Sequence, residues 1–527
     1  MIPQLIKTNH IKNITLSIRM VLSRFLPSLP AKQIQNTTFL ILPAPSQAGG
    51  NPRLRSYGVL KTMPILIAIS LLFCSCSEKK ESGKGSNVLL ITIETLRTDQ
   101  IGCYGGANNL TPNLDAFAAQ GVLFEGMITP VPRTNPSLAS LLTGLYPPHH
   151  GVRNMNVPLS EDITVLPGIL SDSGYKTGAV ISHPSLYIKL GFNNGFDHYD
   201  CEWDAHKVAE DTTDTALSWI KSNKEELFFM WIHYFDPHWF YCPPAEFEEK
   251  YATPFDGTWK SCRDLDITKV SRSTRGEIVF NNTMSDEERE YIRSLYRGEI
   301  AYTDEQVGRL LRELKKLKLT DNLLVIISAD HGESLGEHDF YFEHGAYTYD
   351  VNIKIPCLVR FPSKHPYSQY AGKRIKGQKV NTDILPTILE FLDLPLPENL
   401  DGMSLIPSIV GEEINPRLAF GESGKQYFVN NPKRYLPGIK GKWYFVRDEN
   451  RKLICIPNKD NGIWEFYNLE SDPKETKNIY DPQEPEIKLL QNELKKWMAM
   501  ATTVSPPREL EYTPAIRKKL RMLGYME

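Results

Sequence analysis

The sequence has almost no net charge and few cysteines, and both shortages narrow the class of protein. Its 527 residues hold 60 Lys and Arg against 63 Asp and Glu, a formal net charge of −3. Because this composition gives no basic surface for nucleic acid, nucleic acid is not an expected partner. The 8 cysteines are too few for a disulfide scaffold, and no CxxC pair predicts a zinc ribbon. Cys242 and Cys262 are the most local pair that export would allow to form a disulfide.

A hydrophobic run long enough to cross a bilayer is also missing. The apolar run 65–73 is too short to span a membrane, but its place between Lys61 and Cys74 is typical of a secretory signal. The segment resembles a bacterial lipoprotein signal, in which Cys76 is the lipidated residue because the small Ser75 precedes it. The alternative is a plain signal that is cleaved without lipid.

Length and changes of pattern divide the chain into several segments. The first residues show no sustained period and are either a leader or sequence upstream of a true start at Met63. The part beyond the signal is too long for one small core. The expected segments are 1–62 (leader or upstream sequence), 63–76 (signal), 77–85 (linker), 86–410 (catalytic domain) and 411–527 (C-terminal subdomain).

Apolar runs of strand length alternate with segments of helical period, which predicts a mostly parallel α/β sheet. The expected strands are 87–93, 176–181, 227–232, 323–327 and 356–361. The expected helices are 112–120, 136–143, a long helix that opens with a capping box at Ser285, and 382–392. Beyond residue 411, short aromatic-rich segments and a helix near 485–499 predict a small antiparallel sheet with a helix packed on it.

Metal-ligand side chains follow two of these strands directly. Glu94 comes after the strand 87–93, and Asp330 and His331 come just after the strand 323–327. Because the carboxyl ends of parallel strands meet along one edge of a sheet, these side chains are expected to converge on a crevice and hold a cation. The alternative is that Asp330 only caps a turn and His331 is a surface histidine.

Thr134 lies just before the expected helix 136–143, with Asn135 as its expected cap. Unpaired N–H groups at a helix amino terminus favour an anion, so a hydroxyl there could attack a phosphoryl or sulfuryl group. Glu94, Thr134, Asp330 and His331 together predict a site for one divalent cation, with the nucleophile among its ligands. The histidine favours Zn²⁺ or Mn²⁺ over Ca²⁺. Without such chemistry, Thr134 would be a residue near a helix cap.

Ordered motifs between about residues 86 and 480 resemble those of the sulfatases in the alkaline phosphatase superfamily. They are NVLLITIETLRTD, CYGG, TPNLDAFAAQG, PSLASLLTGLYPPHHGV, DPH, GEIAYTDEQVG, SADHGESLGEH, DILPTILEFL and YNLESDPKETKNI. The resemblance implies an α/β fold, a three-layer α/β/α sandwich like that of alkaline phosphatase, with a small C-terminal α+β subdomain. It also implies a hydrolase of sulfate or phosphate esters.

Several positions depart from the sulfatase pattern. The family carries Cys or Ser, converted to formylglycine, at the position of Thr134, and an Arg at the position of Leu138. A family lysine matches Ser182, and a pair of aspartates matches Glu94–Thr95. Threonine cannot become formylglycine. The set present is similar to that of the phosphoethanolamine and phosphoglycerol transferases, which use a threonine nucleophile and one Zn²⁺ or Mn²⁺. That match implies that His344 contacts the substrate or protonates the leaving group.

The expected function is therefore that of an exported, metal-dependent hydrolase of sulfate or phosphate esters. Thr134 is the expected nucleophile, and His344 or His238 is expected to bind the substrate and to protonate the leaving oxygen. The expected substrate is a small-molecule, glycan or lipid ester. The expected location is the bacterial periplasm or cell surface, with a lipid on Cys76 as the membrane anchor.

Two other functions and several residues stay open. The chain could instead transfer a phospho-substituent to a glycan or lipid, or be a glycan-binding lipoprotein that has lost catalysis. Arg97 is expected to brace the edge of the site through a salt bridge. The sequence does not decide whether His150, His183 and His233 belong to the site or to the surrounding structure.

Overall fold

The computed structural model describes residues 82–503, with gaps at 107–108, 202–206, 255–256, 258, 260, 266–283, 413–415, 425–440 and 458–461. The leader, the signal segment and the lipidation of Cys76 lie outside the described residues and stay predictions. The domain boundary between residues 410 and 411 also stays a prediction. Within the described part, none of the helices is both long enough and apolar enough to cross a membrane.

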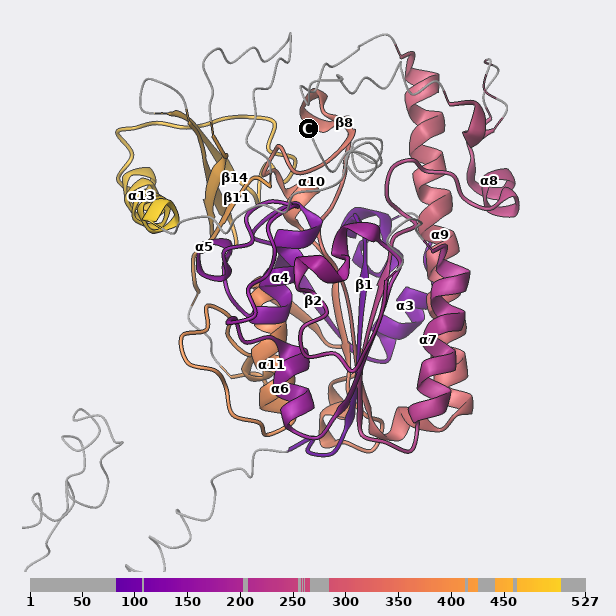
Figure 1. The fold of residues 1–527 in the computed structure, drawn as a ribbon. Coiled ribbons are helices and arrows are strands. Elements are labelled where there is room, and N and C mark those ends of the chain that lie inside the picture. Colours follow the sequence, from indigo (N-terminus) through magenta and orange to yellow (C-terminus); the bar gives the residue numbers. More distant parts are fainter. Residues whose placement is uncertain are drawn as a thin grey trace, which may run out of the picture. The chain divides into compact units, whose positions relative to one another are not determined.

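An eight-stranded sheet with the strand order β10-β2-β9-β6-β1-β5-β3-β4 lies at the centre of the larger domain (Figure 1). Its strands are β1 (Asn87–Ile93), β2 (Val122–Ile128), β3 (Lys176–Ile181), β4 (His198–Cys201), β5 (Phe228–Tyr234), β6 (Leu323–Ala329), β9 (Cys357–Arg360) and β10 (Arg374–Val380). Strand β9 is antiparallel to its neighbours β6 and β2, whereas the other pairs are parallel. The prediction of a mostly parallel sheet is confirmed.

Helices cover both faces of this sheet, with α3, α7 and α9 on one face and α4, α6 and α11 on the other (Figure 1). The helices are α3 (Pro112–Ala119), α4 (Thr134–Thr143), α5 (Pro147–His150), α6 (Leu166–Asp172), α7 (Ala209–Asn223), α8 (Ala245–Tyr251), α9 (Asp286–Lys316), α10 (Asp350–Ile353), α11 (Ile384–Phe391) and α12 (Ile406–Val410). This arrangement is the expected α/β/α sandwich.

Burial on both faces explains the uninterrupted apolar strands. Every residue of β1, β5 and β6 is buried, so these strands lack the alternation of polar and apolar residues seen in half-exposed sheets. Helix α9 returns the chain to β6, and it begins with the predicted capping box. The Ser285 hydroxyl accepts the N–H of Glu288 at 3.1 Å, and the Glu288 carboxylate accepts the N–H of Ser285 at 2.8 Å.

A second, antiparallel sheet forms the small C-terminal subdomain, as predicted. Its strands are β11 (Ala419–Glu422), β12 (Tyr444–Arg447), β13 (Arg451–Ile456) and β14 (Ile463–Asn468), paired in sequence order. Alternate residues point to opposite faces. On one face, Val446, Leu453 and Phe466 pack on α13 (Pro485–Thr503). On the other face, Phe445, Ile454 and Tyr467 share a core with Tyr347 and Tyr349 of the larger domain.

Two short strands, β7 (Ser334–Leu335) and β8 (Tyr341–Glu343), form a hairpin in the segment after β6. A disulfide joins Cys242 to Cys262 on either side of α8, which confirms the most local pairing. The hairpin brings the chain from Asp330 and His331 to His344, another residue of the predicted site.

Candidate active site

Glu94 follows β1 directly, in a turn with an uncommon backbone. The next residue, Thr95, has a φ of 51°, which a β-branched residue rarely adopts. Its carbonyl accepts the Tyr296 hydroxyl at 2.7 Å, and its N–H donates to Asp330 Oδ1 at 3.0 Å. These bonds hold the turn in place and fix the position from which the Glu94 side chain extends.

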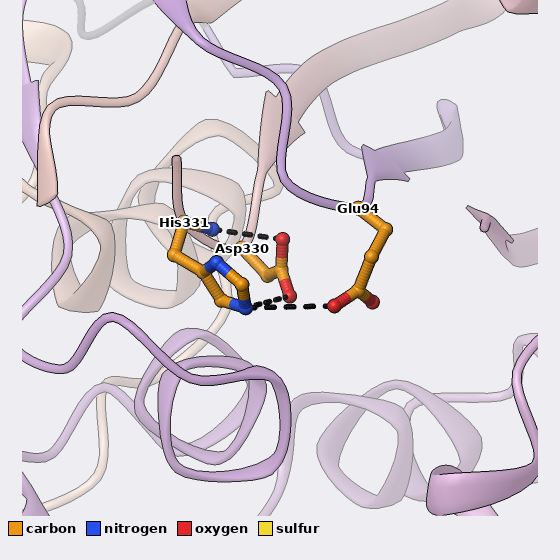
Figure 2. Close-up of side chains that lie close together, drawn as sticks. All are labelled: Glu94, Asp330 and His331. Carbon is orange, nitrogen blue, oxygen red and sulfur yellow. Dashed lines mark hydrogen bonds and ion pairs between the residues drawn. The ribbon is translucent and has the colours of Figure 1, made fainter. Parts of the chain in front are cut away.

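Asp330 and His331 reach the same point from β6. Strands β1 and β6 are parallel with Ile93 opposite Ala329, so the residues that follow the two strands lie side by side. His331 Nε2 lies 3.1 Å from Asp330 Oδ2 and 3.4 Å from Glu94 Oε1 (Figure 2). All three side chains are buried, and one ligand atom from each lies within 4.8 Å of the others.

The tautomer of His331 is set by the backbone. Its Nδ1 lies 2.9 Å from the carbonyl oxygen of Gly332. Because a carbonyl can only accept, Nδ1 carries a hydrogen, and Nε2 is the ring nitrogen left to bind a cation once it gives up the proton that faces the two carboxylates. Gly332 is needed here because a Cβ at this residue would lie 2.1 Å from the carbonyl oxygen of Val351.

Thr134 enters the site from the first residue of α4, the helix that lies against the ends of these strands. The expected start of the helix at Pro136 with Asn135 as cap is wrong, because the helix begins at Thr134 and Arg133 is the cap residue. The Asn135 side chain is used elsewhere: it donates to the carbonyl oxygens of Met155 at 2.7 Å and Ser185 at 3.0 Å.

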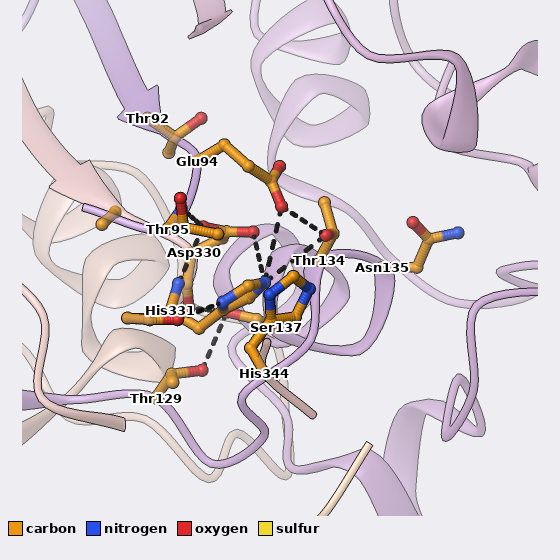
Figure 3. A network of polar contacts seen from close by, with 12 residues as sticks. Thr92, Glu94, Thr95, Thr129, Thr134, Asn135, Ser137, Asp330, His331 and His344 are labelled. Carbon is orange, nitrogen blue, oxygen red and sulfur yellow. Dashed lines mark hydrogen bonds and ion pairs between the residues drawn. The ribbon is translucent and has the colours of Figure 1, made fainter. Parts of the chain in front are cut away.

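The Thr134 hydroxyl donates to Glu94 Oε1 at 2.6 Å and lies 3.5 Å from His331 Nε2 (Figure 3). One turn further along α4, Ser137 donates to the backbone carbonyl of Asp330 at 2.5 Å. The helix is therefore joined to the residues that follow both central strands. The structure brings together all four side chains predicted to surround the cation.

The charges at this point favour a cation. Burial, followed by the nearby Glu94 carboxylate, raises the pKa of Asp330 well above its usual value. Burial lowers the pKa of His331, but the carboxylates of Asp330 and Glu94 outweigh this effect and raise it to about 9. Asp330 Oδ2 accepts no hydrogen bond from the described residues. Two adjacent buried carboxylates, an imidazole nitrogen that loses its proton when a metal binds, and a hydroxyl are a donor set that fits one divalent cation.

His344 and His238 lie beside the quartet. The His344 ring is centred 4.3 Å from that of His331 and 5.2 Å from that of His238. His344 Nδ1 lies 3.1 Å from a Glu333 carboxylate oxygen, and His238 Nδ1 donates to the Trp239 carbonyl at 2.5 Å. Burial and then the neighbouring His331 and His238 hold the pKa of His344 well below its usual value, so this imidazole is neutral near pH 7.

Arg97 and His150, two residues whose role the sequence analysis considered, make structural contacts around the site. Arg97 pairs with Asp99 at 2.6 Å and Glu337 at 2.8 Å, so it braces the edge as expected. His150 has a structural role, since its ring accepts the N–H of Val152 at 3.1 Å and contacts Ser140 at 2.9 Å.

Two further histidines adjoin the predicted site. His183 packs on Phe235 with ring centres 4.4 Å apart. His233 Nε2 lies 2.8 Å from Glu94 Oε2. The sequence left His233 undecided because a strand sequence does not reveal which residue of the neighbouring strand lies opposite.

Leu138 and Ser182, the two positions where the sulfatase pattern has a cationic side chain, do not offer a cation to the site. Leu138 is fully buried in the core on α4. The Ser182 hydroxyl donates to the backbone carbonyl of His233 at 2.7 Å. Arg133 is a buried cation next to Thr134 in the chain, and it contributes to the lowered pKa of His344.

Fold and site together define a class of protein. The α/β/α sandwich gathers two carboxylates, an imidazole and a hydroxyl beyond its central strands, and the family match places the chain in the alkaline phosphatase superfamily. Residues 86–394 match the family model described as sulfatase, and residues 336–503 match the model for the C-terminal region of N-sulphoglucosamine sulphohydrolase. The chain belongs to the sulfatase family and is a hydrolase of that family.

Relatives extend over most of the chain. An N-acetylglucosamine-6-O-sulfatase of Bacteroides thetaiotaomicron is 24% identical over 500 residues, which cover 80% of this chain and 87% of the relative. An arylsulfatase of Clostridium perfringens is 24% identical over 475 residues, 76% of this chain and 91% of the relative. The crystal structure of a phosphonate monoester hydrolase of Agrobacterium radiobacter has a TM-score of 0.63 at 21% identity and covers 80% of this chain and 96% of that one. This last similarity shows a shared fold.

Proposed function

We propose that this protein is a metal-dependent hydrolase of sulfate or phosphate esters in which Thr134 replaces formylglycine as the nucleophile. The observation that carries the proposal is the buried hydrogen bond of 2.6 Å from the Thr134 hydroxyl to Glu94 Oε1. Asp330 and His331 lie next to this pair. A buried hydroxyl that already donates to a carboxylate is prepared to lose its proton as it attacks.

Glu94, Thr134, Asp330 and His331 would hold the cation, which we propose to be Zn²⁺ or Mn²⁺ because one ligand is an imidazole. When bound, the cation would neutralise the anionic ester and lower the pKa of the Thr134 hydroxyl. Thr134 then attacks sulfur or phosphorus, its proton passes to Glu94, and the bond to the leaving oxygen breaks. The N–H groups at the start of α4 stabilise the negative charge on the transferred group.

His344, with His238 beside it, exchanges protons with the leaving oxygen and with the water that later cleaves the Thr134 ester. Because the resting imidazole of His344 is neutral near pH 7, it must first take up a proton from solvent before it can give one to a leaving alkoxide. In its neutral form, the same imidazole can accept a proton from the attacking water.

The substrate we propose is a small-molecule, glycan or lipid ester. Relatives named as glycan sulfatases support the glycan alternative, whereas the threonine nucleophile supports phosphate esters. Screening aryl sulfates, aryl phosphodiesters and aryl phosphonates with Mn²⁺ or Zn²⁺ added would separate these classes. Sulfated and phosphorylated glycans form the second panel.

The nucleophile is tested by comparing Thr134→Ala with Thr134→Ser on the best substrate of the screen. Removing the hydroxyl is expected to lower kcat by a factor on the order of 10³ or more, and serine is expected to keep part of the activity. Hydrolysis by Thr134→Ala at the wild-type rate would reject the proposal.

A transferase is the second candidate, because Glu94 and Thr134 match the threonine-nucleophile transferases of the superfamily. It would pass the group on Thr134 to a glycan or lipid hydroxyl instead of to water. Product that forms only when an acceptor is added would identify it. A chain that binds glycan but takes up no stoichiometric metal would instead support the glycan-binding lipoprotein.

We also propose export to the periplasm or cell surface with a lipid on Cys76. The disulfide between Cys242 and Cys262 supports an oxidising compartment. Fractionation of cells that express the wild type or Cys76→Ala tests the anchor. The wild type is expected in the membrane fraction and the variant in the soluble fraction, and equal distribution of the two would reject lipidation of Cys76.

A further inference from the structure

Glu94 makes a second set of hydrogen bonds on the side of the carboxylate away from Thr134. Its Oε2 lies 2.8 Å from His233 Nε2, while Oε1 accepts the Thr134 hydroxyl. On the opposite side of the imidazole, His233 Nδ1 lies 2.8 Å from Thr92 Oγ1. Thr92 Oγ1 in turn accepts the indole N–H of Trp231 at 3.0 Å. A continuous chain of contacts therefore runs from Trp231 to the proposed nucleophile.

The pairing of two strands produces this chain of contacts. Strands β1 and β5 are parallel, with Thr92 opposite His233. Side chains two residues apart share one face of a strand, and the N–H of Glu94 continues the pairing with β5 by donating to the Tyr234 carbonyl at 2.9 Å, so Glu94 lies on the same face as Thr92 of β1. Trp231 and His233 share a face of β5 in the same way. Figure 3 shows Thr92 and Glu94 next to each other at this edge.

The direction of each hydrogen bond follows from what each group can donate. The Trp231 indole can only donate, so Thr92 Oγ1 accepts from it and has its own hydrogen left to give. Among the described residues, the group within reach of that hydrogen is His233 Nδ1, at 2.8 Å, which must then be the acceptor. His233 Nε2 consequently carries the hydrogen and donates it to the Glu94 carboxylate.

The opposite tautomer would leave groups unsatisfied. If Nδ1 carried the hydrogen, it would point at Thr92 Oγ1, and the Thr92 hydrogen would need another acceptor. His233 Nε2 would also direct a lone pair at Glu94 Oε2. Thr92, Trp231, His233 and Glu94 are all fully buried, so water cannot relieve either conflict.

We propose that His233 is a positioning residue for the metal site, held in its Nε2–H tautomer by Thr92 and Trp231 so that Glu94 Oε1 faces Thr134 and the cation. The inference rests on the proposed function, because it assigns a role toward the same cation. It differs from that proposal in that none of the three supporting residues touches Thr134. Its consequence is measurable as metal affinity, without any substrate.

The experiment measures the dissociation constant for Mn²⁺ by titration calorimetry on the full chain and on two pairs of matched variants. His233→Leu removes the donor, whereas His233→Gln keeps an N–H at the place of Nε2. Thr92→Val removes the hydroxyl, whereas Thr92→Ser keeps it. Loss of a residue that orients a metal ligand weakens metal binding by about 10-fold to 100-fold. We expect Mn²⁺ affinity to fall by that factor in His233→Leu and Thr92→Val. In His233→Gln and Thr92→Ser we expect at least part of the wild-type affinity to be kept.

The double variant His233→Leu with Thr92→Val tests whether the two residues act through one another. If Thr92 acts only by orienting His233, the double variant should bind Mn²⁺ no more weakly than His233→Leu alone. Losses that simply add would reject the proposed order of contacts. Should His233→Leu fail to fold, the pair Thr92→Val and Thr92→Ser still gives the answer, since both changes are small.

Three results would overturn the inference: wild-type Mn²⁺ affinity in His233→Leu, equal losses in His233→Leu and His233→Gln, or no difference between the two Thr92 variants. A wild-type chain that binds no Mn²⁺ would overturn both this inference and the proposed metal site. Undiminished activity in Thr134→Ala, with the expected losses of affinity at His233, would reject only the nucleophile.

Discussion

The side chains that converge beyond β1 and β6 are oriented by neighbours outside the predicted cation shell. The carbonyl of Gly332 accepts a hydrogen bond from His331 Nδ1 and so orients the imidazole ring. The backbone N–H groups of Thr95 and His331 both donate to Asp330 Oδ1. His233 holds the outer oxygen of Glu94. The sequence could identify the residues Glu94, Asp330 and His331, because carboxylates and histidines directly after buried strands are readable. It could not show how they are oriented, because that depends on partners from other strands.

Gly332 gives a prediction at this scale. Gly332→Ala places a Cβ 2.1 Å from the Val351 carbonyl oxygen unless the chain moves, and the same residue anchors His331. We expect the free energy of unfolding to fall by about 1–3 kcal/mol, as for other overpacked sites, together with weaker Mn²⁺ binding. Denaturant unfolding and calorimetry measure the two effects. Gly168→Ala is the control, since the nearest atom to its new Cβ lies 3.6 Å away. Equal behaviour of the two variants would contradict the prediction.

At the scale of elements, α4 depends on contacts that hold both of its ends in place. Its first turn is joined to the Asp330 backbone through Ser137, and its last turn ends at Gly144, which has a φ of 70°. The composition of the segment predicted a helix here, but not its first residue. Asn135 is a strong cap candidate in sequence, yet tertiary contacts to Met155 and Ser185 take its side chain. Such contacts lie outside what local sequence can reveal.

His150 links the pH dependence of stability to this helix. It contacts Ser140 of α4, and burial lowers its pKa to about 3, well below the value of about 6.5 in an unfolded chain. Between pH 6.5 and pH 3, His150 therefore binds a proton in the unfolded state but not in the folded state. The free energy of unfolding is therefore unaffected by His150 above pH 6.5 and falls as the pH drops from 6.5 toward 3. At pH 5 the loss is about 2 kcal/mol.

Denaturant unfolding of the wild type and His150→Gln at pH 8 and pH 5 tests this prediction. Other titrating groups are common to both proteins, so the difference between the two pH dependences isolates His150. We expect the variant to lose less stability on acidification than the wild type. Identical losses would mean that His150 does not supply the effect.

At the scale of the whole molecule, the small sheet is joined to the larger domain by an apolar core and a buried group of charges. Lys452 of β13 lies 3.0 Å from Asp350 and 2.8 Å from Glu475, and Arg447 lies 2.9 Å from Asp350. The aromatic segments near the end of the chain predicted the small sheet. The charged group was not predicted, since Asp350 and Glu475 are far apart in sequence and meet only on folding.

Lys452→Met tests the contribution of these charges. Removing the Lys452 cation leaves the buried Glu475 carboxylate without its ion-pair partner and Asp350 with Arg447 alone, which we expect to reduce the free energy of unfolding by about 3–5 kcal/mol. The matched control is Lys496→Met, which removes an exposed lysine paired with Glu493 on α13 and should change stability by less than about 1 kcal/mol. Denaturant unfolding measures both variants. Equal free energies of unfolding for Lys452→Met and Lys496→Met would show that the buried charges do not stabilise the contact between the small sheet and the larger domain.

The most direct test of the central claim is to locate the cation. Anomalous diffraction from crystals grown with Mn²⁺ should show one strong peak bounded by Glu94, Thr134, Asp330 and His331. In crystals of Asp330→Asn, grown in the same way as a control, the peak should weaken or vanish. A peak elsewhere in the molecule, or no peak in the wild type, would contradict the account of the site.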